Sequence, residues 1–195
     1  MPTVFEGKQT ATVEGPALSL TELRARIEIR RDHAWQPNPG DTAQERKKHW
    51  QAVAEQRAQK VEAGEYIGDE LLPQLRGSKA MTSIGREFLK AAERGNARMM
   101  GAFIEEGFPV NYQDRETEET ALHVTAATRA RNALRVLLSC GLCNFLLRDK
   151  RGRLASEMAY LFGRDPAAAR LLRVKERKQA AANGIKLTRR PQTPP

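Results

Sequence analysis

The chain has 195 residues, of which 29% are charged and only 6% aromatic, and its formal net charge at pH 7 is +9. Its apolar residues, mainly Leu, Ala, Val and Met, suit thin layers of helices better than a large sheet core. No run approaches the roughly 18 apolar residues that span a bilayer, and the first 30 residues lack the pattern of a secretion signal. We therefore expect an all-α, soluble protein that has no membrane span and is cytoplasmic.

Residues 1–18 contain two prolines and two glycines and show no clear period, so we expect an irregular arm. Residues 19–22 (SLTE) have the pattern of a capping box, in which the serine and glutamate side chains bond backbone N–H groups at the start of a helix. A first helix is therefore predicted over 20–31. Pro37 and Pro39 prevent its continuation.

A second capping box, from Thr42 to Glu45, predicts a long helix that ends at Gly64. Its apolar face carries Trp50, Val53, Ala54 and Val61. Its other face carries charges of both signs, namely Arg46, Lys47, Lys48, Glu55, Arg57 and Lys60. We interpret the charged face as a solvated surface, or alternatively as a surface that binds a polyanion.

Residues 64–77 are rich in turn-forming residues, but they contain enough apolar side chains for one short helix. These side chains are Leu71, Leu72 and Leu75. We therefore assign residues 19–80 to a helical N-terminal extension.

The clearest helical pattern lies between residues 120 and 140. Two sets of apolar residues, separated by polar residues 129–132, are each spaced to lie on one face of a short helix. The members of the two sets are Leu122, Ala126, Leu134, Leu137 and Leu138. The pattern predicts a helical hairpin, and Gly141 ends its second helix, as glycine does where the backbone turns left-handed.

The same order of features occurs upstream and downstream of this hairpin. Gly107 and Gly141 are 34 residues apart, and Asp114 and Asp149 are 35 apart. A period near 34 with two helices in each copy is typical of repeat proteins, in which each unit covers the apolar face of its neighbour. We therefore expect a short helical-hairpin solenoid over residues 84–175, capped on its N-terminal side by the helical extension.

The central copy resembles the ankyrin-repeat family. Thr120-Ala121-Leu122-His123 stands where that family has Thr-Pro-Leu-His, with alanine in place of proline. Residues 107–114 (GFPVNYQD) and 149–159 (DKRGRLASEMA) resemble the turn and the opening of its repeats. The resemblance implies paired helices joined by projecting finger turns, and protein recognition without chemistry. It also implies that His123 is a structural group, hydrogen-bonded between adjacent loops and helices.

The only two cysteines, Cys140 and Cys143, form a C-x-x-C pattern. A zinc site needs four ligands, and none of the three histidines is spaced to complete one. A redox pair gains its reactivity from a helix N-terminus, whereas Cys140 lies at the end of a predicted helix. In a third interpretation, the two cysteines are small apolar residues packed at a junction between repeats. This interpretation requires neither additional metal ligands nor a helix N-terminus.

The basic excess is concentrated at the C-terminus. From Arg173 onward there are seven basic residues and one acidic residue, a formal +6 out of the total of +9. The last helix can continue to Ala182, where Asn183-Gly184 stops it. We assign residues 176–195 to a basic, disordered tail that keeps the protein in solution or attracts polyanions.

No pattern of catalytic, cofactor-binding or metal-binding residues stands out. We therefore expect no enzymatic activity, no cofactor and no metal site. Paired carboxylates can act as acid and base only in an enclosed cleft that separates their pKa values. The acidic residues Glu105, Glu106, Glu116, Glu118 and Glu119 are accordingly interpreted as solvated charge.

The resemblance favours a module that binds a partner protein through its finger turns and the concave face of the repeats. We expect the contacts at exposed aromatic, arginine and neighbouring residues, because aromatics and arginine most often anchor interfaces. The candidates are Phe108, Tyr112, Gln113, Arg115, Arg129, Arg131, Leu146, Leu147, Arg148, Lys150 and Arg151. The alternative is an adaptor that binds nucleic acid or another polyanion through the basic tail and the long N-terminal helix. A third, weaker alternative is that residues 1–80 are an effector or enzymatic module delivered by the repeats.

Overall fold

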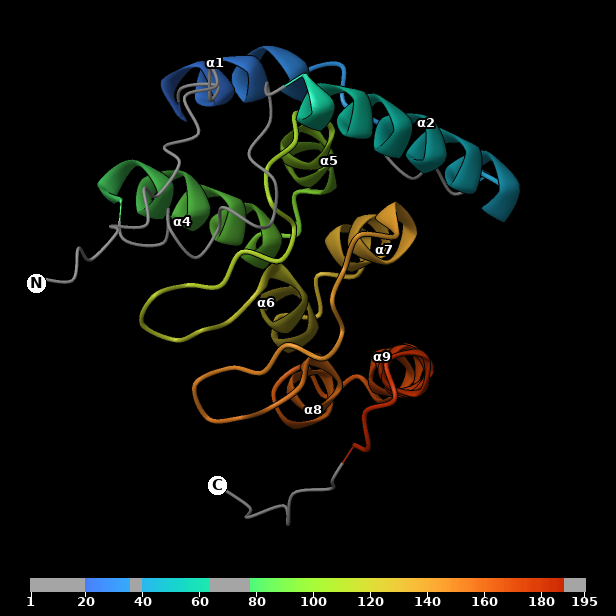
Figure 1. Ribbon diagram of the computed structural model, residues 1–195. Helices are drawn as coiled ribbons and strands as arrows, with labels where there is room; N and C mark the ends of the chain where they lie inside the picture. The colour runs from blue at the N-terminus through green and yellow to red at the C-terminus, as the bar shows by residue number, and fades with distance from the viewer. Residues whose placement is uncertain (1–19, 36–39, 64–77, 188–195) are drawn as a thin grey trace, which may run out of the picture.

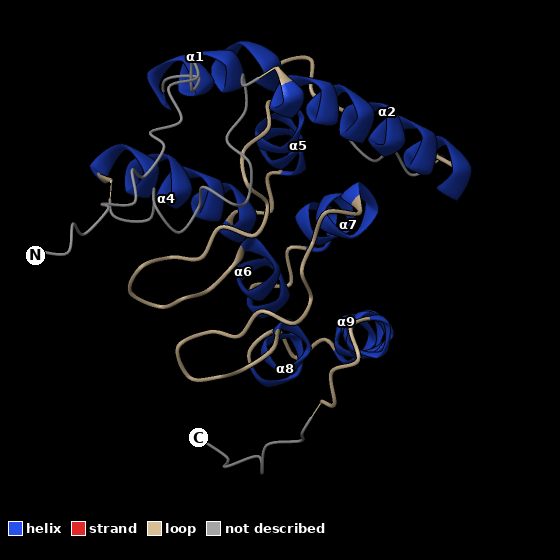
Figure 2. Cartoon of the chain, viewed as in Figure 1, coloured by secondary structure: helices blue, strands red, loops and turns tan. Residues whose placement is uncertain are grey.

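The computed structural model describes residues 20–35, 40–63 and 78–187, and every regular element in these ranges is a helix (Figure 2). The prediction of an all-α fold is confirmed for this part of the chain. Each of its helices is too short or too polar to cross a bilayer. The helices are α1 (Leu20–Arg31), α2 (Ala43–Glu62), α4 (Lys79–Glu93), α5 (Ala97–Glu105), α6 (Ala121–Ala127), α7 (Arg131–Cys140), α8 (Ala155–Leu161) and α9 (Pro166–Ala182).

Six of these helices form three hairpins, α4 with α5, α6 with α7, and α8 with α9. The hairpins follow one another through the molecule, so that α4, α6 and α8 form one row and α5, α7 and α9 form another (Figure 1). Neighbouring helices pack along the first row, and α5 packs against α7 in the second. The hairpin predicted from residues 120–140 is the central one.

The backbone repeats its conformation from one hairpin to the next. Gly95, Arg129 and Arg164 lie in the three hairpin turns, and their φ angles are 68°, 56° and 46°. Gly107 and Gly141, which end α5 and α7, also have positive φ angles of 86° and 74°. Corresponding positions are 34 or 35 residues apart, so the period seen in the sequence is also a period of backbone geometry.

Small residues allow the first row of helices to pack closely. Ala92, Ala126 and Ala159 are almost completely buried in α4, α6 and α8. Gly163, in the last hairpin turn, lies so close to α6 that an added Cβ would be 2.2 Å from the carbonyl oxygen of Ala126. Larger side chains at these positions would push the hairpins apart.

An aromatic cluster fills the first hairpin and corrects two predictions. Phe108 contacts Phe88 and Phe103, with ring centroids 4.8 and 5.3 Å apart, and Tyr112 lies 5.8 Å from Phe108. Phe108 and Tyr112 are 0% and 3% exposed, so the expectation that they are surface residues was wrong. The Tyr112 ring lies against the backbone of Gly85, where a Cβ would overlap it.

Helix α1 is held to the first hairpin by a buried carboxylate. Glu106 follows α5 and is 4% exposed, and it accepts hydrogen bonds from Arg26 and Arg30 at 2.9 and 2.8 Å. Glu105 accepts from the backbone of Trp35 at 3.1 Å. The interpretation of this acidic pair as solvated charge was therefore wrong, because α1 and the segment that follows it cover both carboxylates.

Helix α2 begins with the predicted capping box. The backbone N–H of Thr42 donates to the Glu45 carboxylate at 2.8 Å, and that of Glu45 donates to the Thr42 hydroxyl at 3.1 Å. Of the predicted apolar face, Trp50 and Val53 are buried. Helix α2 packs against α7, so both N-terminal helices contact the hairpins.

The boundary predicted at residue 176 is too early, because α9 continues to Ala182, where Asn183 follows as its C-cap. Glu176 is 2% exposed, and it accepts hydrogen bonds from the backbone N–H and the hydroxyl of Ser156 at 3.0 and 2.7 Å. Burial raises the pKa of this carboxyl. The predictions for residues 1–19, 64–77 and 188–195 lie outside the described residues.

We expect Arg164→Gly to raise the free energy of unfolding by about 0.5–1 kcal/mol, because glycine adopts a positive φ without the steric cost that other residues pay. Urea denaturation measures the change. The matched control is Arg170→Gly, which removes the same side chain from an exposed position inside α9 and should lower stability by about 1 kcal/mol. A loss of stability in both variants would contradict the strain assigned to Arg164.

Candidate functional site

Two long loops project from the same side of the row of helices (Figure 1). The first finger, residues 106–120, connects α5 to α6, and the second finger, residues 141–154, connects α7 to α8. They lie next to each other because their parent hairpins are neighbours. The fingers and the helices beside them form the candidate site.

An aspartate organises each finger. Asp114 accepts hydrogen bonds from the backbone N–H groups of Glu116 and Thr117 at 2.9 and 3.0 Å. Partial burial opposes ionisation of Asp114, but the N–H groups of Thr117 and Glu116 outweigh it and lower its pKa. In the second finger, buried Asp149 accepts from the N–H of Arg153 at 2.7 Å and forms an ion pair with its guanidinium at 2.6 Å.

The two fingers are hydrogen-bonded to each other, and at least one main-chain atom takes part in each bond. The backbone N–H of Lys150 donates to the carbonyl of Thr117 at 2.9 Å. The side-chain amide of Gln113 donates to the carbonyl of Arg148 at 3.0 Å. At the base of the fingers, the N–H of Asn144 donates to the Asn111 side chain at 2.7 Å. The second finger is therefore fixed relative to the first.

His123 links the start of α6 to the second finger. Its Nδ1 accepts from the backbone N–H of Thr120 at 3.2 Å, and its Nε2 lies 3.0 Å from the carbonyl oxygen of Arg153. Nε2 therefore carries the proton, since a carbonyl can only accept. Burial lowers the pKa of this imidazole. The geometry agrees with the structural role that the family resemblance implied.

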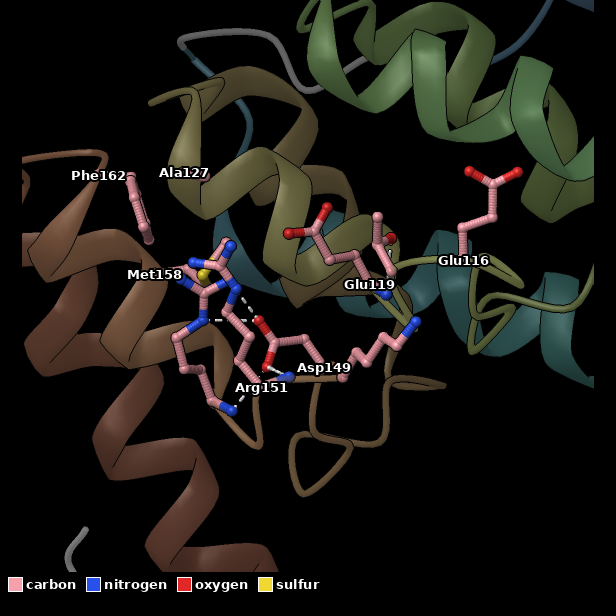
Figure 3. A pocket seen from close by; sticks show the side chains of 10 residues that line it. Glu116, Glu119, Ala127, Asp149, Arg151, Met158 and Phe162 are labelled. Carbon is pink, nitrogen blue, oxygen red and sulfur yellow. Dashed lines mark hydrogen bonds and ion pairs between the residues drawn. The ribbon is translucent and has the colours of Figure 1, made fainter. Parts of the chain in front are cut away.

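An open groove with a volume of about 500 Å³ lies between the fingers and helices α6 and α8 (Figure 3). We call it the finger groove. Its apolar part is formed by Ala127, Met158 and Phe162. The Phe162 ring is 51% exposed, and the guanidinium carbon of Arg153 lies 4.9 Å from its centroid. An exposed aromatic ring held by a cation is suited to contact with an apolar side chain of another molecule.

Charges of opposite sign line the two walls of the finger groove. The first finger contributes Glu116 and Glu119, and the second contributes Arg151 (Figure 3). Lys150 of the second finger also lines the groove. Partial burial, followed by the nearby charge of Asp149, raises the pKa of Glu119. The groove thus combines an apolar floor, an acidic wall and a basic wall.

Two of the predicted site residues, Lys150 and Arg151, line the finger groove and are exposed. Gln113 and Arg148 form hydrogen bonds that hold the fingers in place. The Gln113 side chain donates to the carbonyl of Arg148, and the Arg148 guanidinium donates to the carbonyl of Gly152 at 2.6 Å. Leu146 and Leu147 are half-buried.

The other three predicted arginines lie outside the finger groove. Arg115 is exposed and lines a separate shallow depression beside α4. Arg129 and Arg131 lie at the turn of the central hairpin, and Arg131 forms an ion pair with Asp165 at 2.8 Å. The structure therefore does not bring all the predicted residues to one site.

Phe162 and Arg153 were not predicted to be site residues, and Glu119 was interpreted as solvated charge. Phe162 follows α8 in a position where an aromatic residue is ordinarily taken for core. Its exposure depends on how the last hairpin turn lies beside the second finger, and no local pattern reports that. The positive φ of Glu118 and Gly152, at corresponding positions of the two fingers, was likewise visible only in the structure.

Both cysteines are free thiols and are buried. Cys140 and Cys143 each donate to the carbonyl of Leu137, at 3.1 and 3.2 Å. Within the described ranges, no three His, Cys, Asp or Glu residues are grouped so that they could hold a metal ion. Burial and the shared acceptor are consistent with packing at a junction between hairpins.

No protein-family model matches the chain, and a search of curated proteins finds none with significant sequence similarity to it.

We expect the stability of the protein to fall as the pH decreases below about 6.5, the ordinary pKa of histidine. Because burial holds the pKa of His123 lower in the folded protein, the unfolded chain binds more protons between the two pKa values. The stabilisation from His123 is therefore complete above about pH 6.5 and is lost as the pH falls towards the folded-state value. Urea denaturation at a series of pH values measures this.

The variant His123→Asn should lose this component of the pH dependence and about 1–3 kcal/mol of stability, because buried polar partners are left unpaired. The control is His33→Asn at an exposed position, which should keep the wild-type profile. A His123→Asn profile parallel to that of the wild type would refute the assignment.

Proposed function

We propose that this chain is a non-enzymatic adaptor, an ankyrin-like solenoid of three helical hairpins that binds a partner protein through the finger groove. The observation that carries the proposal is the groove between two fingers that are fixed to each other by a main-chain hydrogen bond, from Lys150 to Thr117, and by a bond from the Gln113 side chain to the carbonyl of Arg148. A surface that is already ordered loses little conformational freedom when a partner binds, which favours affinity.

The repeated geometry supports the ankyrin-like assignment. Left-handed turn positions recur every 34 or 35 residues, and two fingers emerge from successive hairpins on one side. His123, in the segment that resembles Thr-Pro-Leu-His, bonds to both its own helix start and the next finger. These are the contacts expected of a structural histidine in a stack of repeats.

The side chains of the finger groove favour binding over catalysis. Asp149, which could serve as an acid or base, is buried and paired with Arg153. His123, which bonds to the second finger but does not line the groove, uses both ring nitrogens in structural hydrogen bonds. The groove exposes Phe162 and the side chain of Lys150 to another molecule.

The two walls and the floor define the chemistry of the partner. An apolar side chain of the partner would lie on Phe162, and a carboxylate would face Lys150 and Arg151. A basic residue would face Glu119 at the other wall, where Glu116 is already paired with Arg86 at 3.1 Å. The partner is therefore expected to present a short segment that carries both charge signs around an apolar anchor.

We expect that peptides selected by display on the wild-type protein will bind the double variant Lys150→Glu/Phe162→Ala at least tenfold more weakly. The variant removes an aromatic anchor and reverses one charge, and a central interface residue contributes about 2 kcal/mol, more than the 1.4 kcal/mol that corresponds to tenfold. Isothermal titration calorimetry with the selected peptides gives both affinities.

The control for this experiment is Lys178→Glu, at an exposed position of α9 outside the finger groove, which should bind the peptides like the wild type. Circular dichroism and urea denaturation verify that both variants are folded. Equal affinity for the wild type and the double variant, or equal loss in the control, would exclude the finger groove as the binding surface.

A further inference from the structure

A second groove lies between helices α2, α7 and α9 and has a volume of about 660 Å³. We call it the basic groove. It shares no lining residue with the finger groove. It exists because α2 packs across α7, which brings the N-terminal half of α2 near the end of α7 and the middle of α9.

Four cationic side chains line the basic groove, and none of the described residues that line it is acidic. Arg46 and Lys47 come from α2, Arg135 from α7 and Lys175 from α9. Cations gathered from three separate helices without a carboxylate among them raise the local positive potential and attract anions.

The ordinary explanation for basic residues near a helix end does not apply to these four. A cation is stabilised by the helix dipole only within the last turn of a helix. Arg46 and Lys47 lie near the start of α2, where the dipole disfavours a cation. Arg135 precedes the last turn of α7, and Lys175 lies in the middle of α9. The cluster therefore gains no dipole stabilisation in its own helices.

The basic groove also has an apolar part. Leu138 and Leu142 line it and are partly buried, and Trp50 also lines it and is 3% exposed. Grooves that hold single-stranded nucleic acid present exposed aromatic rings on which bases stack. Trp50 is the only aromatic residue among the described lining residues, and it is almost fully covered. The surface suits carboxylates combined with aliphatic side chains better than bases.

We propose that the basic groove binds an acidic segment of a partner protein, in which carboxylate side chains flank leucine-like residues. The carboxylates pair with Lys47, Arg135 and Lys175, and the aliphatic side chains lie on Leu138 and Leu142. This surface is additional to the finger groove, and the proposal is independent of the function assigned there. The two grooves allow the chain to hold two segments at once.

Tryptophan fluorescence reports on this groove directly, because Trp35 and Trp50 are the only two tryptophans of the chain and are in ring contact at 5.7 Å. The probe is a short synthetic peptide that carries glutamate and leucine at helical spacing. A second peptide with glutamine in place of every glutamate tests the role of charge. We expect the acidic peptide to give a saturable change in fluorescence that weakens with added salt, and the glutamine peptide to give none.

The decisive variant is Lys47→Gln/Arg135→Gln/Lys175→Gln, which should bind the acidic peptide about tenfold more weakly, because it removes three ion pairs that are each weakened by solvent and salt. The matched control, Arg170→Gln/Arg177→Gln/Lys178→Gln, removes the same charge from exposed positions of α9 outside the groove. It should bind the peptide like the wild type. Circular dichroism checks the fold of both variants.

Equal weakening in the two triple variants would overturn the proposal, because it would indicate attraction to net charge alone. Tighter binding of a single-stranded oligonucleotide, lost in the same groove variant, would overturn it in favour of nucleic acid. The finger-groove variant Lys150→Glu/Phe162→Ala should bind the acidic peptide normally, so failure of one proposal is distinguishable from failure of the other.

Discussion

Each hairpin of this chain buries its neighbour's apolar side, and the other features of the structure depend on that packing. No single pair of short helices has enough buried surface to be stable alone. Ala92 and Ala126 in the helices, and Gly163 in the last turn, keep adjacent backbones close. The same closeness places one finger beside the next, so the packing that stabilises the fold also determines the spacing of the candidate binding surface.

Glu105, the last residue of α5, and Glu106, which follows it, connect the hairpins to the N-terminal helices. Glu106 holds Arg26 and Arg30 of α1, and Glu105 holds the backbone of Trp35. Breaking a buried ion pair by removing one partner is costly, because the other charge remains without compensation. This contact holds α1 against α5. Glu105 also lies 3.3 Å from the imidazole of His49 in α2, so the acidic pair contacts both N-terminal helices.

The sequence predicts the parts of this fold that depend on local order. The spacing of Leu122, Ala126 and Leu134 is enough to predict the central hairpin, and the Thr42 capping box marks the start of α2. The burial of Phe108 and Glu106 was not predictable in this way, because it depends on Phe88 and Arg26, which are remote in the chain. Lys150 and Arg151 were predicted to be site residues from the finger pattern. Phe162 and Arg153 were missed for the same reason as the buried residues, since their contact arises from tertiary packing.

The hydrogen bonds that join the fingers have a consequence for how such a surface can diversify. The bond from Lys150 to Thr117 uses only backbone atoms. The Gln113 side chain bonds to the backbone carbonyl of Arg148, and His123 bonds to the backbone carbonyl of Arg153. Substitution of the side chains at positions 150 and 151 therefore leaves these bonds in place. Specificity for a new partner can be acquired by changing the exposed side chains while the framework that presents them stays constant.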